Sequence, residues 1–265
     1  MNSFIVAMST IHIFGASGLI GTSLKRICDL KGIPNITYSS FKKDNIDYAL
    51  DIRFKDNFES LNNISSEDIV VNLAAIANPS IVFKEPKLST EINIEGNRNI
   101  LNWTMRNNAK FVFMSSVEVF NGELNSYKEE DPTNPINLYG KQKEASEKEI
   151  IKNYLKNSLI TRTSWNISDN GIGRCLVDVT LKSLKESNAK MAIDNIFTIS
   201  SATETAENLL RLIIRKMKGI VHIASPSPIS RYEIAELIKN NIDIEDLNFL
   251  YQYYFESIQL FHIVK

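Results

Sequence analysis

The heptapeptide GASGLIG, residues 15–21, follows the apolar run TIHIFG (10–15) and opens a stretch that continues through SLKRICDLKG. The run predicts a buried strand, and the stretch after it predicts a helix. Glycine at positions 15, 18 and 21 allows a tight turn, close approach of a pyrophosphate and close packing of helix on strand. The first N–H groups of the helix also attract phosphate. The turn therefore predicts a dinucleotide site made by Gly15, Ser17, Gly18, Leu19, Ile20 and Gly21, with a purely structural glycine turn as the alternative.

Strand and helix patterns continue to alternate after this turn. Because the strand runs are apolar on both faces, they predict a parallel sheet that helices cover on both sides. The expected strands are ITYSS (36–40), IVVNLAA (69–75), KFVFMSS (110–116) and SLITRTS (158–164), with helices over 87–108 and 139–156. The fold class is therefore α/β, a Rossmann-type doubly wound parallel sheet.

The pattern changes after Trp165, where NISDNGIG is rich in turn residues. The C-terminal third predicts helices in CLVDVTLKSLKES, ATETAENLLRLIIRKM and SRYEIAELIKNN, a strand-like piece in AKMAIDNIFTIS and a buried strand in GIVHIAS. Ser230 and Glu233 have the spacing of a capping box. We expect residues 1–165 to form the dinucleotide-binding domain, with 198–224 returning to it. Residues 166–197 and 225–265 are expected to form a smaller substrate-binding lobe.

Composition narrows the function classes. The chain has 265 residues, 43% of them hydrophobic, and a net charge of −1, which argues against nucleic acid and anionic membranes as partners. No apolar run reaches the roughly 18 residues of a membrane span, and the opening MNSFIVAMST lacks the features of a signal peptide. We therefore expect a cytoplasmic protein. The two cysteines and three histidines lack metal-ligand spacing, so no metal site is expected.

The stretch ITYSSFKKDN (36–45) bears on the choice of cofactor. An NAD site commonly has an acidic residue near the end of the second strand, which binds the ribose 2′-hydroxyl. Here Ser39, Ser40, Lys42 and Lys43 stand in that region and suit a 2′-phosphate, which favours NADP over NAD. Two alternatives remain: the lysines belong to a solvated loop, or Asp44 binds the ribose of NAD.

The segment NLYGKQKEA (137–145) carries a second candidate site. Tyr139 and Lys143 are four residues apart and so lie on one face of the expected helix. A nearby ammonium is expected to lower the pKa of the phenol, which is normally about 10. The tyrosine then becomes a proton donor to a carbonyl oxygen as hydride arrives, and the lysine can also bind the nicotinamide ribose. Alone, this spacing is common by chance, and two solvated side chains would then be the better interpretation.

A serine strengthens the catalytic interpretation. Ser115 and Ser116 end the strand expected over 110–116, at the edge of the sheet where such folds bind ligands. A hydroxyl there can orient a substrate carbonyl. We therefore expect Ser116, Tyr139 and Lys143 to form the catalytic group.

These motifs resemble the extended short-chain dehydrogenase/reductase family, and the resemblance runs from about Thr10 to Asn240. It rests on GASGLIG, LDIR (50–53), NLAAIANP (72–79), the asparagine in EINIEGNRNI, MSSVEVF and EEDPTNPINLYGKQKEASE (129–147). RTSWN (162–166) and IDNIFTISSATETAENL are most similar to the dTDP-4-dehydrorhamnose reductase branch.

The resemblance implies roles for further residues. Asp51 and Ile52 would line the adenine pocket, and Asn93 would belong to the cofactor site. Trp165 would face the sugar nucleotide, with a core aromatic as the alternative. The residues expected along the cofactor phosphates and ribose are Ala74, Ala75 and Ala77.

The function implied is an NADP-dependent reductase of a nucleotide-activated 4-ketosugar that serves surface-polysaccharide synthesis. One alternative is an epimerase or dehydratase with tightly held NAD, and another is a non-catalytic NADP-binding regulatory subunit. The chain departs from the branch where STDYVFDG is usual, because Val117 and Glu118 replace the acid and the tyrosine. It also ends soon after the helix at 232–240, so we expect the usual C-terminal elements of the substrate lobe to be missing or altered, with either a reduced lobe or a truncated chain as the explanation. A homodimer through sheet-flanking helices is a further expectation.

Overall fold

The strand β1 (Ile11–Phe14) has all four side chains buried, because neighbouring strands flank it on both sides and helices cover both faces. The computed structural model describes residues 9–41, 45–61, 64–168, 176–184 and 190–241. These residues divide into two compact units. The first extends to Thr163 and also contains Ala206–Ile223; the second contains Ser164–Thr205 and the described residues from Ala224 on.

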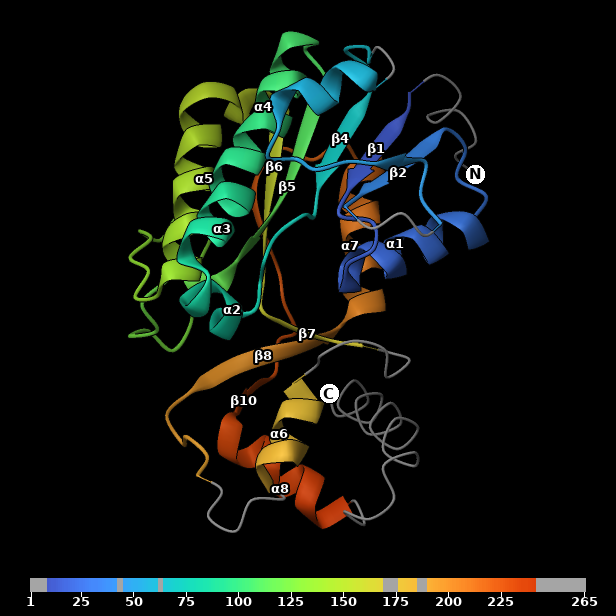
Figure 1. The fold of residues 1–265 in the computed structure, drawn as a ribbon. Coiled ribbons are helices and arrows are strands. Elements are labelled where there is room, and N and C mark those ends of the chain that lie inside the picture. The colour runs from blue at the N-terminus through green and yellow to red at the C-terminus, as the bar shows by residue number, and fades with distance from the viewer. Residues whose placement is uncertain (1–8, 42–44, 62–63, 169–175, 185–189, 242–265) are drawn as a thin grey trace. The chain divides into compact units, whose positions relative to one another are not determined.

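The first unit contains a seven-stranded sheet in the order β3-β2-β1-β4-β5-β6-β9. Figure 1 labels β2, β1, β4, β5 and β6 of this sheet. Its other strands are β2 (Ile36–Ser40), β3 (Tyr48–Ala49), β4 (Ile69–Asn72), β5 (Lys110–Ser116), β6 (Ser158–Thr163) and β9 (Gly219–Ile223). Neighbouring strands in this sheet pair in parallel, with Phe14 opposite both Ser39 and Asn72. The strands therefore end along one edge, and the predicted Rossmann-like α/β fold is confirmed.

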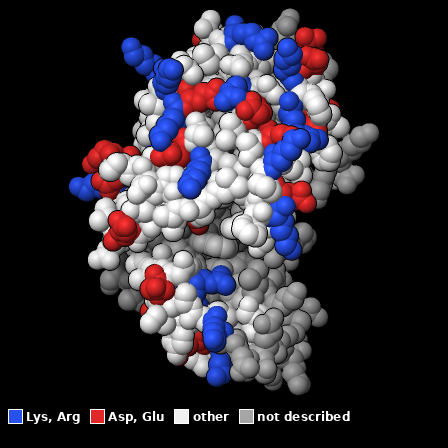
Figure 2. Space-filling view, turned by 60° about the vertical axis from the view of Figure 1, so that its left-hand side comes forward, with Lys and Arg blue, Asp and Glu red and all other residues white. Residues whose placement is uncertain are grey.

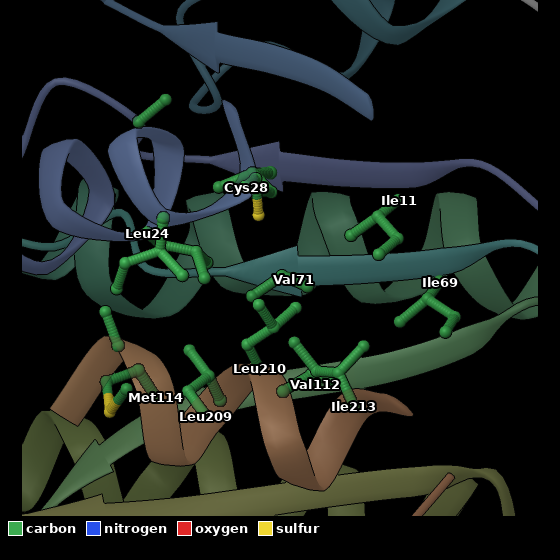
Figure 3. Packing of buried hydrophobic residues seen from close by; sticks show 14 of the residues in the cluster. Ile11, Leu24, Cys28, Ile69, Val71, Val112, Met114, Leu209, Leu210 and Ile213 are labelled. Atoms are coloured by element: carbon green, nitrogen blue, oxygen red, sulfur yellow. The ribbon is translucent and has the colours of Figure 1, made fainter. Parts of the chain in front are cut away.

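Helices cover both faces of this sheet. On one face lie α1 (Leu19–Leu30) and α7 (Ala202–Ile214), whose apolar side chains meet Val71 and Val112 of the sheet (Figure 3). On the other face lie α4 (Asn97–Arg106) and α5 (Leu138–Tyr154). The helix expected over 87–108 is in fact α3 (Pro86–Thr90), a π-helical stretch (Glu91–Gly96) and α4, preceded by α2 (Pro79–Lys84). Short 3-10 turns occupy Lys55–Ser60, Val117–Val119 and Leu155–Asn157.

The second unit contains a three-stranded sheet in the order β10-β8-β7. Its strands are β7 (Trp165–Ile167), β8 (Ile196–Ser201) and β10 (Pro228–Ser230), and its helices are α6 (Leu176–Leu184) and α8 (Arg231–Asn241). Their core includes Ile167, Leu176 and Ile234. The predicted capping box is confirmed, since Ser230 N–H donates to Glu233 Oε2 at 2.7 Å and Glu233 N–H donates to Ser230 Oγ at 3.1 Å.

The division differs from the sequence expectation at its boundaries, since Ser164, Trp165, residues 198–205 and Ala224 lie in the second unit and not in the first. Strand β8 overlaps the segment 198–224 that was expected to return to the first domain, but it pairs with β7 and β10 in the second unit. From that segment, the first unit includes α7 from Ala206 and the strand β9. The strands β3, β7 and β10, of two or three residues each, were not predicted because such short segments show no apolar periodicity.

Candidate active site

The glycine turn after β1 is sterically constrained. Gly15 has φ +82°, and a Cβ at this position would lie 2.6 Å from the Ala74 nitrogen. A Cβ at Gly21 would lie 2.3 Å from the Gly15 carbonyl oxygen. The turn can therefore take this path only with glycine at both positions, and it lies directly against the backbone after β4. Gly18 caps α1, whose first residues are Leu19 and Ile20.

The end of β2 contacts the same turn. The Ser39 carbonyl accepts hydrogen bonds from the N–H groups of Gly15 and Ala16, at 2.9 and 3.2 Å. The hydroxyl groups of Ser17 and Ser40 are hydrogen-bonded to each other. Ser17 and Ser39 were both predicted as site residues, and these hydrogen bonds join the turn and the end of β2 that carry them. Lys42, Lys43 and Asp44 lie outside the described residues.

The segment after β4 is fixed by Asn93. The Asn93 Oδ1 accepts from Ile76 N–H at 2.8 Å, and its Nδ2 donates to Ile76 O at 3.0 Å and to Gln142 Oε1 at 2.7 Å. Asn93 is buried, so its amide holds this loop rather than facing solvent. The loop carries the three predicted alanines, which are partly or fully exposed: Ala74, Ala75 and Ala77. A direct cofactor contact by Asn93 stays a prediction.

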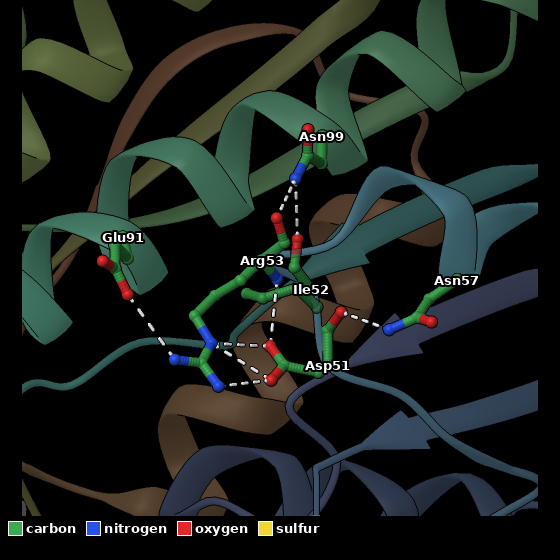
Figure 4. Close-up of polar contacts among 6 residues, drawn as sticks. All are labelled: Asp51, Ile52, Arg53, Asn57, Glu91 and Asn99. Atoms are coloured by element: carbon green, nitrogen blue, oxygen red, sulfur yellow. Dashed lines mark hydrogen bonds and ion pairs between the residues drawn. The ribbon is translucent and has the colours of Figure 1, made fainter.

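The carboxylate of Asp51 already has a partner (Figure 4). Arg53 Nη2 donates to Asp51 Oδ2 at 2.6 Å and Arg53 Nε donates to Asp51 Oδ1 at 3.0 Å, and this pairing lowers the pKa of Asp51. The main-chain carbonyl of Ile52 accepts from Asn99 Nδ2 at 2.9 Å, and the Ile52 side chain is buried against Gly96. If Asp51 contacts the adenine as predicted, its carboxylate would bind both the adenine and Arg53. This partner was not predicted, although LDIR places the two charges two residues apart.

The three predicted catalytic residues come from two neighbouring elements. Ser116 ends β5, and Tyr139 and Lys143 lie on α5. The first turn of α5 packs onto the backbone after Ser116, because a Cβ at Gly140 would lie only 2.0 Å from the Glu118 carbonyl oxygen. This contact holds the start of α5 beside the carboxyl end of β5.

Two polar residues in this region were missed as parts of the site. Asn137 caps α5 by accepting a hydrogen bond from Gly140 N–H at 2.8 Å, and its Nδ2 donates to the Glu118 carboxylate. Ser116 Oγ accepts a hydrogen bond from Glu118 N–H at 3.2 Å. The signal for Asn137 was its place before the helix. The Glu118 side chain is visible in the sequence only as a departure from the family pattern.

Burial dominates the electrostatics of the tyrosine and the lysine. Burial raises the pKa of Tyr139, and the Glu118 carboxylate raises it further. Burial also lowers the pKa of Lys143 to about 8, against the Glu147 carboxylate, which raises it. The prediction that the ammonium lowers the pKa of the phenol is wrong for this structure. The physical reason is that burial disfavours the phenolate, while Lys143 Nζ donates to the Met114 carbonyl at 2.8 Å.

Trp165 belongs to the second unit. It lies on β7, and its ring packs beside Phe197 of β8 with a centroid separation of 5.6 Å. The indole is partly buried at the edge of that unit's core. A role in sugar recognition stays a prediction.

Charged side chains of both signs lie on the face of the first unit that Figure 2 shows. Over the first unit in Figure 2, basic and acidic side chains are interspersed, in keeping with ion pairs such as Lys148–Glu144 at 2.9 Å. Within the described ranges, no helix is both long and apolar enough to cross a bilayer. The same residues contain no cluster of metal-ligating side chains. Cys28 is a buried free thiol, and Cys175 lies outside the described residues.

Comparison with known proteins identifies the family. Residues 8–253 match the RmlD substrate binding domain. The chain is 30% identical to the spore coat polysaccharide biosynthesis protein SpsK of Bacillus subtilis, over 90% of this chain and 81% of that protein. It is 24% identical to methionine adenosyltransferase 2 subunit beta of Bos taurus, over 85% of this chain and 70% of that protein.

A solved structure agrees with this match. The crystal structure of a hypothetical dTDP-4-dehydrorhamnose reductase from Sulfolobus tokodaii is 28% identical, with a TM-score of 0.72 over 88% of this chain and 82% of that one. The resemblance predicted from GASGLIG, the YxxxK spacing and RTSWN is therefore confirmed. The chain belongs to the RmlD substrate binding domain family.

Proposed function

We propose that the chain is an NADP-dependent reductase of a nucleotide-activated 4-ketosugar, working in the cytoplasm and serving polysaccharide synthesis. The observation that carries this proposal is the buried pair Tyr139 and Lys143 on α5, with Lys143 Nζ donating to the Met114 carbonyl of β5, the strand that ends at Ser116. The glycine turn lies at the same edge of the same parallel sheet. Membership of the RmlD family supports a nucleotide sugar as the substrate class.

The residues around the turn fit a dinucleotide. Gly15 and Gly21 allow the turn to pack tightly on the protein backbone, and Gly18 caps α1 without a side-chain hydrogen bond to its first N–H groups, which suits phosphate binding there. Among the described residues, Ser39 and Ser40 end β2 without an acidic neighbour in that strand, which favours a 2′-phosphate and hence NADP. We assign the turn and the loop after β4 to the cofactor. When bound, NADPH supplies the hydride that reduces the keto carbon.

Tyr139 is suited to donate the proton. Burial and Glu118 keep the phenol protonated at neutral pH, so it can transfer its proton to the carbonyl oxygen of the substrate. Ser116 Oγ accepts from Glu118 N–H, which leaves its own hydroxyl hydrogen to donate to the same substrate oxygen. The Lys143 ammonium stabilises the phenolate that proton transfer leaves on Tyr139, until solvent restores the proton.

A second candidate is a regulatory subunit that binds NADP without turnover. It is favoured by the 24% identity to methionine adenosyltransferase 2 subunit beta, which covers 85% of this chain. The retained group of Ser116, Tyr139 and Lys143 favours the reductase instead.

The test is NADPH oxidation in the presence of a panel of nucleotide-linked 4-ketosugars, with NADPH binding measured separately by thermal stabilisation. The reductase predicts stoichiometric NADPH loss with at least one sugar. NADPH binding without oxidation across the panel would overturn the reductase in favour of the regulatory subunit. An NAD that co-purifies with the protein and is not consumed would instead favour the epimerase or dehydratase. Gel filtration of the same samples tests the homodimer expected from the sequence.

A further inference from the structure

Three buried residues form a column on one face of α5. Tyr139, Lys143 and Glu147 are spaced by four residues, so each lies one helical turn from the next. Their exposed fractions are 9%, 4% and 1%. A carboxylate so completely buried requires a partner, since an unpaired charge in the interior is strongly destabilising.

The partner of Glu147 is Arg162 on β6. Arg162 Nε donates to Glu147 Oε1 at 3.0 Å and Arg162 Nη2 donates to Glu147 Oε2 at 2.8 Å. Both side chains are 2% exposed. This bidentate geometry fixes both the distance and the relative orientation of the guanidinium and the carboxylate. The ion pair therefore joins the buried face of α5 to the strand β6.

The guanidinium of Arg162 also reaches the segment between β5 and α5 at two points. Its Nη1 donates to the main-chain carbonyl of Glu129 at 3.2 Å, and the group lies 4.9 Å from the centre of the Phe120 ring. The Glu129 carboxylate in turn accepts from the N–H of His222 on β9, at 3.0 Å. Arg162 therefore connects α5 and β6 to the segment between β5 and α5, which follows Ser116.

The column sets the surroundings of Lys143. Its ammonium faces the Phe113 ring and the Met114 carbonyl on β5, with Tyr139 above it and Glu147 below it on α5. Glu118 is the charged group that acts on Tyr139 from the segment after β5. Glu147 is the group that opposes the loss of charge from Lys143 on burial.

We propose that Glu147 and Arg162 are positioning residues whose ion pair fixes Tyr139 and Lys143 at the carboxyl end of β5 and sets the Glu147 carboxylate one helical turn from Lys143. This inference rests on the catalytic role given to Tyr139 and Lys143 in the proposed function. In this proposal neither Glu147 nor Arg162 contacts the substrate, and both act through Lys143 and Tyr139. No spacing rule connects the two residues in sequence, since one lies on a helix and the other on the next strand.

The central test is Glu147→Gln, which keeps the shape of the side chain and removes its charge. The matched control is Glu149→Gln on the same helix, which removes a carboxylate paired with Arg98 at 2.8 Å but more exposed. We expect the kcat of Glu147→Gln to fall at least about tenfold, because small displacements of catalytic groups cost rate steeply. The KM for NADPH should change little, and the alkaline limb of the pH–rate profile should move to lower pH. The control should retain kcat and profile, whereas an unchanged kcat and profile in Glu147→Gln would overturn the proposal.

A second readout does not depend on turnover. The titration of the Lys143 ammonium, followed by NMR of labelled lysine, should move to lower pH in Glu147→Gln and stay in place in Glu149→Gln. An unmoved titration would overturn the inference even if the protein reduces no ketosugar. A moved titration without turnover in the native protein would remove the proposed function and keep the electrostatic role.

A double variant tests whether a loss of kcat in Glu147→Gln comes only from a destabilised fold. Glu147→Gln leaves the Arg162 guanidinium without its ionic partner, which can destabilise the fold. The double variant Glu147→Gln with Arg162→Met removes both charges and should recover stability without recovering kcat. Recovery of native kcat in the double variant would contradict a positioning role.

Discussion

The ammonium of Lys143 donates a 2.8 Å hydrogen bond to the main-chain carbonyl of Met114, the residue two before Ser116 on β5. A lysine on α5 is thus tied to the strand that ends in the proposed substrate-orienting serine. The bond fixes a positive charge beneath Tyr139 in a buried region, where charges interact more strongly than in water.

Replacing this lysine should separate catalysis from stability. We expect Lys143→Met to lower kcat by about 10²–10³-fold, since it removes the charge that stabilises the phenolate. The free energy of unfolding should not fall by much, because methionine fills similar volume and the burial of an amine no longer opposes folding. Steady-state kinetics and urea unfolding measure the two effects. Lys148→Met, at a side chain that is 66% exposed on the same helix, is the control and should leave kcat unchanged.

Removing the hydroxyl group of Tyr139 should lower kcat, whereas removing that of Tyr154 on the same helix should lower stability. Tyr139→Phe should reduce kcat by about 10²–10⁴-fold, the usual contribution of a general acid, with the NADPH Kd nearly unchanged. Tyr154→Phe, at the other end of the helix, removes a 2.6 Å hydrogen bond to the Ala109 carbonyl and should cost stability instead. Turnover that survives in Tyr139→Phe would exclude this residue as the proton donor.

Two glycines with nearly the same backbone angle allow the cofactor turn to be tested. Gly15 and Gly122 have φ of +82° and +80°, but a Cβ would strike Ala74 at Gly15 and meet nothing within 4 Å at Gly122. Gly122→Ala should therefore show only the backbone cost, about 1–2 kcal/mol. Gly15→Ala should lower the free energy of unfolding further and weaken NADPH binding, both measurable by thermal shift with and without NADPH. Equal effects at the two positions would contradict the steric account.

Stability should decline on mild acidification because of His12. Burial lowers the pKa of His12 in the folded state, against the attraction of Asp68, so the unfolded chain binds the proton more readily. The contribution of the neutral imidazole is complete above the unfolded pKa of about 6.5 and is lost as the pH falls from there through the folded pKa. The pKa of His222 is also lowered, chiefly by burial, so its protonation contributes to the same loss of stability. Urea unfolding across this range should show the decline, and His12→Gln, which cannot titrate there, should reduce its slope.

Local patterns in the sequence predicted much of the fold, because they depend on residues close together in the chain. The strand ITYSS is β2 residue for residue, and the glycines of GASGLIG occupy a turn that excludes a Cβ at two of its positions. The π-helical stretch Glu91–Gly96 has no such pattern, since it differs from an α-helix only in hydrogen-bond register.

Properties set by the tertiary environment were harder to predict. The spacing of Tyr139 and Lys143 correctly placed them on one face of a helix, but it could not show how deeply the phenol is buried. Burial reversed the expected direction of its pKa shift. The pairing of Glu147 with Arg162 likewise depends on a helix and a strand meeting across the first unit. The roles of these side chains toward cofactor and substrate stay predictions that the variants above test.

The pairing of β9 with β6 has a consequence for biosynthesis. The stretch Ser164–Thr205, which belongs to the second unit, separates the two strands in the chain. When synthesis has reached Thr163, strand β6 is complete but its partner β9 is not, so one edge of β6 is unpaired. Unpaired strand edges can pair with strands of other chains. The nascent protein is therefore exposed to misassembly at β6 until β9 has been synthesised through Ile223.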